Sequence, residues 1–499
     1  MGNNYTFSEF SRQSLKGIII IYVNGIVKII KKTWVLWVLL IAKLSKYTST
    51  ENKYILLCIS LFLFFLFIRS YLIFKFFQFK LDKDTFVLKQ GVLSRKKTTV
   101  LFERIQNVNF EQNLIQQIIN VYGVSIETAG SKKTEIKIKA LSHSKAIALK
   151  KRIFEKSTSI NKEEVDKTVE PFLKINFKNL LRVSLTENHI YSSILLLTVL
   201  VSGYQQIKDV LVYFIEKKDF ETSIANSGEI ILGSFVFIFL AIALFIIGSI
   251  LVSFVRVIVM HFELHVYLKK NTFEITQGLF KKKTVVLRKE KVQNITISTN
   301  PIKRKLGISF VNFKQAVSGG GKKKREKEIK IVGCNVKQLE EIKSVLFNTN
   351  KLDGEHKEIP HTYYKTKSLY GAALLLILTN LFLFWTIKRV DVLYSNFLLI
   401  PLFYFLITKR VKKSFFKKTN DLLLVGSGLI ETHYTYLELF KIQNIKMKQT
   451  VFQEKRNIVD LVLQTASGKI KIPCVREERA MEIYNQILYK VESSNKRWM

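Results

Sequence analysis

The 499-residue sequence predicts a polytopic α-helical membrane protein that carries three copies of a small antiparallel β-sheet domain. Three observations lead to this fold class. A short motif recurs three times with the same spacing, long apolar runs precede each copy, and the polar segments between the runs are strongly basic. Self-similarity at a constant spacing is typical of repeated domains, and long uncharged runs indicate membrane helices.

The repeated motif is a glycine and an aliphatic-Gln-Asn-aliphatic run that begins fourteen positions further on. Its copies are Gly91 with Gln106 and Asn107, Gly278 with Gln293 and Asn294, and Gly428 with Gln443 and Asn444. Such a Gln-Asn pair could bind a ligand, or it could hydrogen-bond backbone at a bulge or turn. Because the pair recurs once in every copy, we expect the structural role.

Two apolar runs precede each copy. The six runs are at residues 33–48, 54–77, 187–204, 229–256, 368–386 and 392–408. A helix needs about 20 apolar residues to cross a bilayer core. The first run is short, and a buried core helix is its alternative interpretation. The runs predict about six transmembrane helices in three hairpins.

The charge pattern predicts the orientation in the membrane. The chain has 79 Lys plus Arg against 39 Asp plus Glu, a formal net charge of +40, and nearly all of it lies outside the apolar runs. Segments that stay in the cytoplasm carry such an excess. We expect a multi-pass plasma-membrane protein with all three domains and both termini in the cytoplasm, and no nucleic-acid partner.

The N-terminal segment shows no cleaved signal peptide. Residues 14–32 mix Ile and Val with Lys and Asn, which suits a helix in the membrane interface or a cytoplasmic extension of the first membrane helix. Both alternatives stay open. The three cysteines, Cys58, Cys334 and Cys474, have no spacing that predicts a disulfide framework or a metal site.

The periodicity of each copy predicts a small β domain. In the first copy, residues 121–128 and 135–140 alternate as half-buried strands do, and residues 142–154 have helical spacing with Ser142 as N-cap. We expect each copy to form about seven strands and one closing helix. The predicted boundaries are 1–32 for the N-terminal segment, 33–77 for the first membrane hairpin, 78–156 for the first domain, 157–186 for a linker and amphipathic segment, 187–258 for the second hairpin, 259–348 for the second domain, 349–366 for a linker, 367–410 for the third hairpin and 411–492 for the third domain.

This order of membrane hairpin, Gly-hydrophobic strand pair, Gln-Asn segment and closing helix resembles the bacterial pleckstrin-homology-like (PH-like) domain of the second type, bPH2. Three copies joined to three membrane hairpins resemble membrane proteins of the YdbT type. The resemblance implies a curved antiparallel sheet or barrel capped by a helix, and it implies no enzymatic activity. It also implies a link to envelope stress and to resistance against membrane-active peptides, and a smaller single-domain PH-like membrane relative as a partner.

The opening β-hairpin of two copies is basic. Arg95, Lys96 and Lys97 follow Gly91, and Lys281, Lys282 and Lys283 follow Gly278, whereas the third copy has Glu431 there. The first two sets resemble the lipid-contacting hairpin of eukaryotic pleckstrin domains, and basic residues gain about 1 kcal/mol each beside an anionic leaflet. Ordinary solvated lysines are the alternative.

No segment predicts catalysis, a cofactor or a metal site. Gly321-Lys322 lacks the other residues of a phosphate-binding loop, and His261, Glu263 and His265 are not in the zinc-protease order. We therefore expect a non-enzymatic membrane protein that binds lipid headgroups or a protein partner through three separate domains and supports envelope integrity. A transporter or exporter component with regulatory PH-like domains is the alternative, although ionisable residues, which usually mark transport paths, are rare in the apolar runs.

Overall fold

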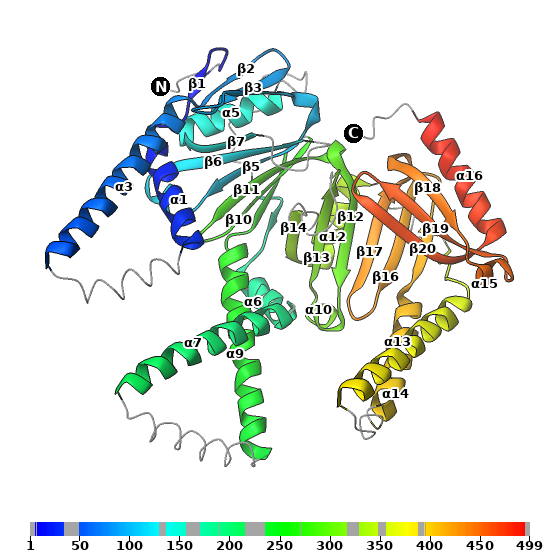
Figure 1. Cartoon of the computed structure of the whole chain (residues 1–499). Coiled ribbons are helices and arrows are strands. Elements are labelled where there is room, and N and C mark those ends of the chain that lie inside the picture. The colour runs from blue at the N-terminus through cyan, green and yellow to red at the C-terminus, as the bar shows by residue number, and fades with distance from the viewer. Residues whose placement is uncertain are drawn as a thin grey trace.

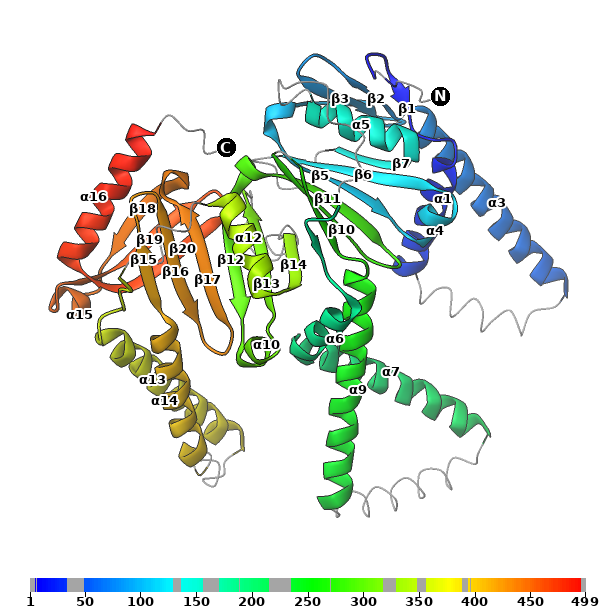
Figure 2. The ribbon, with the colours of Figure 1, turned by 180° about the vertical axis from the view of Figure 1, so that it is seen from behind.

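Strands of all three repeats stand side by side in one row, and helices project from that row towards one side (Figure 1). The computed structural model describes residues 5, 7–33, 49–128, 136–155, 170–187, 189–214, 235–269, 271–316, 329–347, 356–387, 394 and 396–494. The view from behind shows the same row (Figure 2).

The elements repeat in the same order three times. The first repeat contains β1 (Ser11–Arg12), α1 (Gly17–Lys32), α3 (Ser49–Lys75), β2 (Gln78–Leu81), β3 (Thr85–Gln90), β4 (Lys96–Leu101), η1 (Phe102–Arg104), β5 (Ile105–Gln112), α4 (Leu114–Ile118), β6 (Val121–Thr128), β7 (Ile136–Ser142) and α5 (His143–Glu155). The second contains β8 (Leu173–Lys174), α6 (Phe177–Thr186), α7 (His189–Phe214), α9 (Phe235–His261), β9 (His265–Lys269), β10 (Thr272–Gln277), β11 (Lys282–Arg288), η2 (Lys289–Lys291), β12 (Val292–Thr299), α10 (Pro301–Lys305), β13 (Ser309–Gln315), β14 (Ile329–Cys334) and α12 (Val336–Leu346). The third contains α13 (Tyr363–Ile387), α14 (Asn396–Lys413), β15 (Phe415–Lys418), β16 (Leu422–Gly428), β17 (Thr432–Glu438), η5 (Leu439–Lys441), β18 (Ile442–Lys448), α15 (Val451–Glu454), β19 (Ile458–Thr465), β20 (Gly468–Arg476) and α16 (Glu477–Ser493).

Each repeat has a core between its own two antiparallel sheets. In the first repeat, Phe79 and Phe86 of the opening strands meet Ile126 and Ile136 of the later strands, and Leu149 of α5 closes the same core. Alternation along β6 turns Val124, Ile126 and Thr128 inwards. The other repeats have corresponding cores.

The sheets continue from one repeat into the next. β5 of the first repeat pairs with β11 of the second, with Asn107 opposite Leu287. β12 of the second repeat pairs with β17 of the third, with Asn294 opposite Leu437. Both leucines stand nine positions after their repeat's motif glycine, so the two junctions have the same register. The two junctions produce two large sheets. One has seven strands in the order β7-β6-β5-β11-β10-β9-β8, and the other has six in the order β14-β13-β12-β17-β16-β15.

The expectation that the three domains are separate folded modules is therefore wrong. Val286 of the second repeat lies in the core of the first. Likewise, Leu422 and Leu424 of the third repeat lie in the core of the second. Neighbouring repeats share both backbone hydrogen bonds and buried apolar surface, because β5 and β12 each pair with a strand of the next repeat.

A short segment before each membrane helix completes the fold. β1 pairs with β2, β8 pairs with β9, and Glu358 forms an isolated bridge with Phe416 of β15. Leu173 of β8 and Leu180 of α6, within the predicted linker and amphipathic segment, are buried in the second core. That this segment adds to the core was not predicted from the sequence, because the residues around 157–170 are mostly polar.

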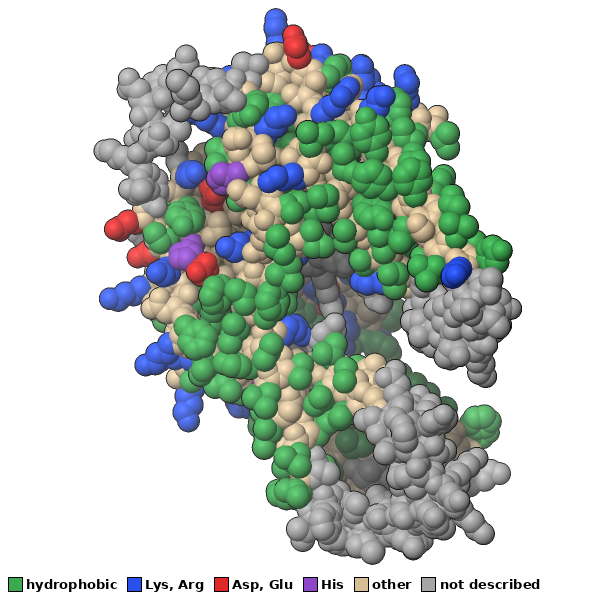
Figure 3. All heavy atoms as spheres, turned by 90° about the vertical axis from the view of Figure 1, so that its left-hand side faces the viewer, with side chains coloured by type: hydrophobic (Ala, Val, Ile, Leu, Met, Phe, Trp, Pro, Cys, Tyr) green, Lys and Arg blue, Asp and Glu red, His purple; other side chains and the backbone are tan. Residues whose placement is uncertain are grey.

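Three of the described helices are long and apolar enough to span a membrane, with spans at Lys53–Lys75, Ile242–His261 and Tyr363–Thr386. A shorter apolar stretch, Ser192–Gly203, lies in α7. Most of the first predicted run, residues 34–48, lies outside the described residues. Six spans and their hairpin arrangement remain predictions. On the face drawn in Figure 3, hydrophobic side chains form broad patches, while Lys and Arg are spread over the rest.

Helix α1 packs against α3 and β7. The Tyr22 ring meets the Phe67 ring edge-on at 5.8 Å, and a Cβ on Gly17 would lie 2.9 Å from that of Ala140. The segment is thus held between a membrane helix and a sheet. Both alternatives for residues 14–32 agree with this position.

Candidate functional site

The motif glycine makes the tight turn of each opening β-hairpin. Gly91, Gly278 and Gly428 have φ angles of 114°, 106° and 128°. A Cβ at these positions would lie 1.9 to 2.2 Å from the carbonyl oxygen three residues later. Only glycine takes this conformation without strain, which explains why it recurs.

Each of these hairpin tips lies beside the C-terminal end of a helix that precedes its sheet. Gly278 N donates to Phe262 O at 2.8 Å, and Leu279 N donates to Val259 O at 3.0 Å, at the end of α9. In the third repeat, Lys413 Nζ donates to Leu429 O and to Ile430 O at 2.7 Å. The second and third tips are therefore held at the C-terminal ends of α9 and α14.

In the first repeat the Arg95 guanidinium lies 5.5 Å from the Phe76 ring centre, just beyond α3. An exposed apolar side chain stands at every tip: Leu93 (102% exposed), Phe280 (52%) and Ile430 (66%). These side chains, with the tips that carry them, form what we term the hairpin rim.

Short helices extend this rim. Gln117, next to the exposed Ile118 of α4, donates to Phe280 O at 3.1 Å. Lys303 of α10, next to the exposed Ile302, forms an ion pair of 2.6 Å with Glu431. The rim thus combines apolar and charged side chains from neighbouring repeats.

The predicted lipid-contact residues differ in their surroundings. Arg95, Lys96 and Lys97 are exposed. Lys281 forms an ion pair of 2.8 Å with Glu111 of the first repeat, while Lys282 and Lys283 lie in β11 opposite β5. The first tip therefore offers the strongest uncompensated positive charge of the three.

The Gln-Asn pairs stand at the junctions between repeats. Asn107 Nδ2 donates to Gln315 Oε1 at 2.6 Å, and Gln315 Nε2 donates to Gln106 O at 3.2 Å. Asn294 Nδ2 donates to Ser467 Oγ at 2.7 Å. The strand register shifts at the pair in every repeat, through a β-bulge or a similar irregularity.

A family model described as the bacterial PH domain matches residues 19–157, 227–349 and 371–491. The chain belongs to the bacterial PH domain family. Over 267 residues it is 26% identical to the UPF0699 transmembrane protein YdbT of Bacillus subtilis (strain 168), an alignment that covers 50% of this chain and 51% of that protein. The chain thus spans about half the length of the curated relative it matches. The family resemblance predicted from the motif is confirmed.

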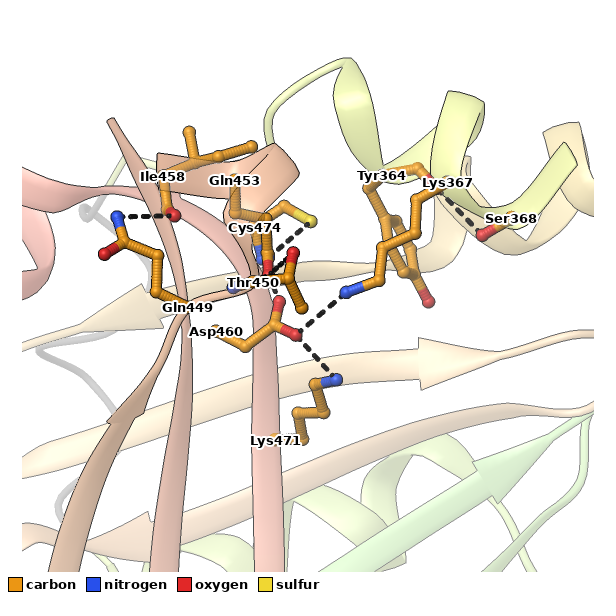
Figure 4. Close-up of polar contacts among 10 residues, drawn as sticks. All are labelled: Tyr364, Lys367, Ser368, Gln449, Thr450, Gln453, Ile458, Asp460, Lys471 and Cys474. Carbon is orange, nitrogen blue, oxygen red and sulfur yellow. Dashed lines mark hydrogen bonds and ion pairs between the residues drawn. The ribbon is translucent and has the colours of Figure 1, made fainter. Parts of the chain in front are cut away.

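In the third PH-like repeat a buried carboxylate joins the sheet to membrane helix α13 (Figure 4). Asp460 Oδ2 accepts from Lys471 at 2.9 Å and from Lys367 of α13 at 3.3 Å, and Oδ1 accepts from Cys474 N at 2.8 Å. Burial opposes ionisation of Asp460, but these hydrogen bonds and charges outweigh it and hold its pKa below the ordinary value. The ionised carboxylate therefore stabilises this joint.

A second buried carboxylate joins the first two PH-like repeats. Glu274 of β10 forms ion pairs with Lys150 of α5 and, at 3.1 Å, with Lys269. Burial opposes its ionisation, but the two lysines outweigh that effect and lower the pKa of Glu274. The sequence offered no signal for either carboxylate.

A cavity of about 980 Å³ lies where the three PH-like repeats meet, at the strand ends remote from the rim. Its lining mixes cations with carboxylates: Arg104, Arg288, Lys289, Lys291 and Lys441 with Asp84, Glu103, Glu290 and Glu438. Lys291 donates to Glu103 O at 3.0 Å, and Lys441 donates to Val292 O at 2.7 Å. A basic residue two positions before each motif Gln was the signal that sequence reasoning missed.

The histidines considered for metal binding have other partners. His261 Nδ1 lies 2.8 Å from Gln277 Oε1, and His265 Nδ1 lies 2.8 Å from Glu263 O. The Gly321-Lys322 segment lies outside the described residues. Within the described ranges, no group of three or more potential metal ligands occurs.

Proposed function

We propose that this chain is a non-enzymatic scaffold of the bacterial plasma membrane whose joined PH-like repeats lie on the anionic cytoplasmic leaflet. One observation carries the proposal: every repeat sets its opening β-hairpin beside the C-terminal end of a helix whose apolar run is predicted to cross the membrane, and exposes an apolar side chain there. The first tip adds Arg95, Lys96 and Lys97, each of which gains about 1 kcal/mol near an anionic surface.

Shared sheets make this contact multivalent. Because the repeats are joined strand to strand, binding at one tip holds the others at the membrane with a high effective concentration. A rigid row of membrane-bound domains would support envelope integrity and resistance to membrane-active peptides. A smaller single-domain PH-like membrane protein is the proposed protein partner.

The polar contacts between the helices give little support to the alternative function, an exporter component. In the described part of the membrane helices, Asn380 donates to Asn396 Oδ1 at 3.1 Å, and the Ser193 and Ser249 hydroxyls lie 2.7 Å apart. Both contacts join neighbouring helices, α13 with α14 and α7 with α9. Such polar contacts hold membrane helices together.

The experiment uses the full chain in nanodiscs, with an environment-sensitive dye on a cysteine at Leu93 in a Cys58→Ser background. We expect nitroxide lipids to quench the dye more strongly in phosphatidylglycerol than in phosphatidylcholine discs. Arg95→Ala/Lys96→Ala/Lys97→Ala and high salt should remove the difference, because salt screens exposed charges.

The matched control is a dye on a cysteine at Glu103, beyond the other end of β4, roughly 20 Å away at the usual rise of a strand. That dye should remain unquenched in both lipids. Equal quenching at Leu93 and Glu103, or quenching at Leu93 that ignores lipid charge and the triple substitution, would contradict the proposal.

A further inference from the structure

The third PH-like repeat leaves open the sheet edge through which the other repeats are joined. β5 and β12 are hydrogen-bonded on both sides, to β6 and β11 and to β13 and β17. β18, the corresponding strand, pairs only with β19 among the described strands. An unpaired edge of this kind is a template for another strand.

The motif residues on this edge are exposed in the third repeat alone. Asn107 and Asn294 are 3% and 1% exposed because the following repeat covers them. Gln443 and Asn444 occupy the same positions in β18 and face solvent. The side chains that make the first two junctions are thus present in the same bulge, and among the described residues no strand pairs with this edge.

The charges along β18 indicate which kind of strand can pair with it. At the first junction, Glu111 of β5 is opposite Lys283 and forms an ion pair with Lys281. The residue that corresponds to Glu111 is Lys448, which is exposed. An incoming strand in the same register therefore needs carboxylates where the second repeat has Lys281 and Lys283.

A second copy of the chain does not meet this need. Among the described strands, the edge that it could offer is β4, whose residues corresponding to Lys281 and Lys283 are Ser94 and Lys96. Lys96 would stand opposite Lys448, and like charges directly opposite each other destabilise a strand pair. This repulsion disfavours the pairing of β18 in one copy of the chain with β4 in another copy.

We propose that β18 docks the opening sheet of a PH-like unit from another polypeptide, with carboxylates facing Lys448 and backbone hydrogen bonds along the strand. The contact is β-augmentation, in which the backbone gives affinity and side-chain pockets give specificity. It is independent of lipid binding, since it uses the strand edge and not the rim.

The test places carboxylates on the β4 edge of the full chain, so that one copy can supply the acidic strand that β18 of another copy requires. In detergent, the wild-type chain should be a monomer by light scattering. Ser94→Glu/Lys96→Glu places carboxylates opposite Lys448, and this variant should associate head to tail as its concentration rises, because such contacts do not close on themselves by a two-fold axis. Lys448→Glu alone should also associate, through Lys96.

The combined Ser94→Glu/Lys96→Glu/Lys448→Glu variant restores like charges and should be a monomer again. Lys337→Glu, an exposed position on α12, controls for the change in net charge and should stay monomeric. Thermal unfolding of every variant checks that the fold is intact. Two charge reversals that both stay monomeric would overturn the proposal, and a wild-type chain that associates through β18 would make the occupant a second copy.

Discussion

Asn294 donates a 2.7 Å hydrogen bond to Ser467, a residue 173 positions later in the next repeat. The bond is buried, and it lies beside the pairing of β12 with β17. A motif that looks like an internal feature of one domain is therefore a contact between two domains. The three repeats are best understood as one structure with two equivalent junctions.

This position gives a first prediction. Asn294→Ala should lower the free energy of unfolding by about 1–3 kcal/mol, since it removes the buried hydrogen bond to Ser467 between two repeats. Asn444→Ala is the matched control at the exposed third copy and should change stability by no more than about 0.5 kcal/mol. Chemical denaturation in detergent measures both. Equal effects would argue against a junction role for the motif.

The hairpin glycine gives a second prediction. Gly278→Ala should destabilise the chain by about 1–3 kcal/mol, because the residue has a positive φ and an added Cβ would meet Lys281 O at 2.2 Å. Gly25→Ala, in α1 with open space around it, should be neutral or stabilising by up to about 1 kcal/mol. Thermal unfolding compares the two. A neutral Gly278→Ala would show that the turn is not strained by a side chain.

Much of this architecture could be predicted from sequence. The repeats follow from the equal spacing of the motif glycine and Gln-Asn pair in the three copies, the β character from the alternation of apolar residues, and the family from the resemblance that these features carry. The strand partners could not be predicted, because an edge strand such as β5 has the same alternation whether its neighbour is β4 or β11. The three Gln-Asn pairs are also identical in sequence, so nothing in the motif shows that Asn444 is exposed while Asn107 is buried.

Acid should weaken the joint between α13 and the third sheet. The pKa of Asp460 is depressed in the folded chain, so its contribution is complete above the ordinary Asp value, about 3.9, and is lost as the pH falls through the folded pKa. Asp460→Asn should cost about 1–3 kcal/mol at neutral pH. The difference from wild type should shrink in more acidic buffer. A difference that persists undiminished at low pH would contradict the ionised role.

Topology can be tested in whole cells. Cysteines at Thr48, Asp219 and Asp391, which lie in the predicted external loops, should react with an impermeant thiol reagent in a Cys58→Ser background. A cysteine at Lys337, exposed on α12 of the second repeat, should react only after the cells are permeabilised, because positively charged segments stay inside. Labelling at Lys337 in intact cells would reverse the proposed orientation.

The central claim is that the repeats are joined strand to strand, and one disulfide tests it most directly. Thr296 of β12 is opposite Thr435 of β17, and their hydroxyl oxygens lie 3.3 Å apart. Burial raises the pKa of Cys334 to about 12 and that of Cys474 to about 11, so neither thiol competes at neutral pH.

In a Cys58→Ser chain, Thr296→Cys/Thr435→Cys should form an intramolecular disulfide under mild oxidation, seen as faster migration on a non-reducing gel. The control pair, Thr296→Cys/Arg476→Cys, joins β12 to the end of β20 that is remote from the Asn294–Ser467 contact, and should stay reduced. Rapid and complete closure of the first pair alone is the predicted result. Failure of that pair to close, or equal closure of both pairs, would contradict the shared sheet.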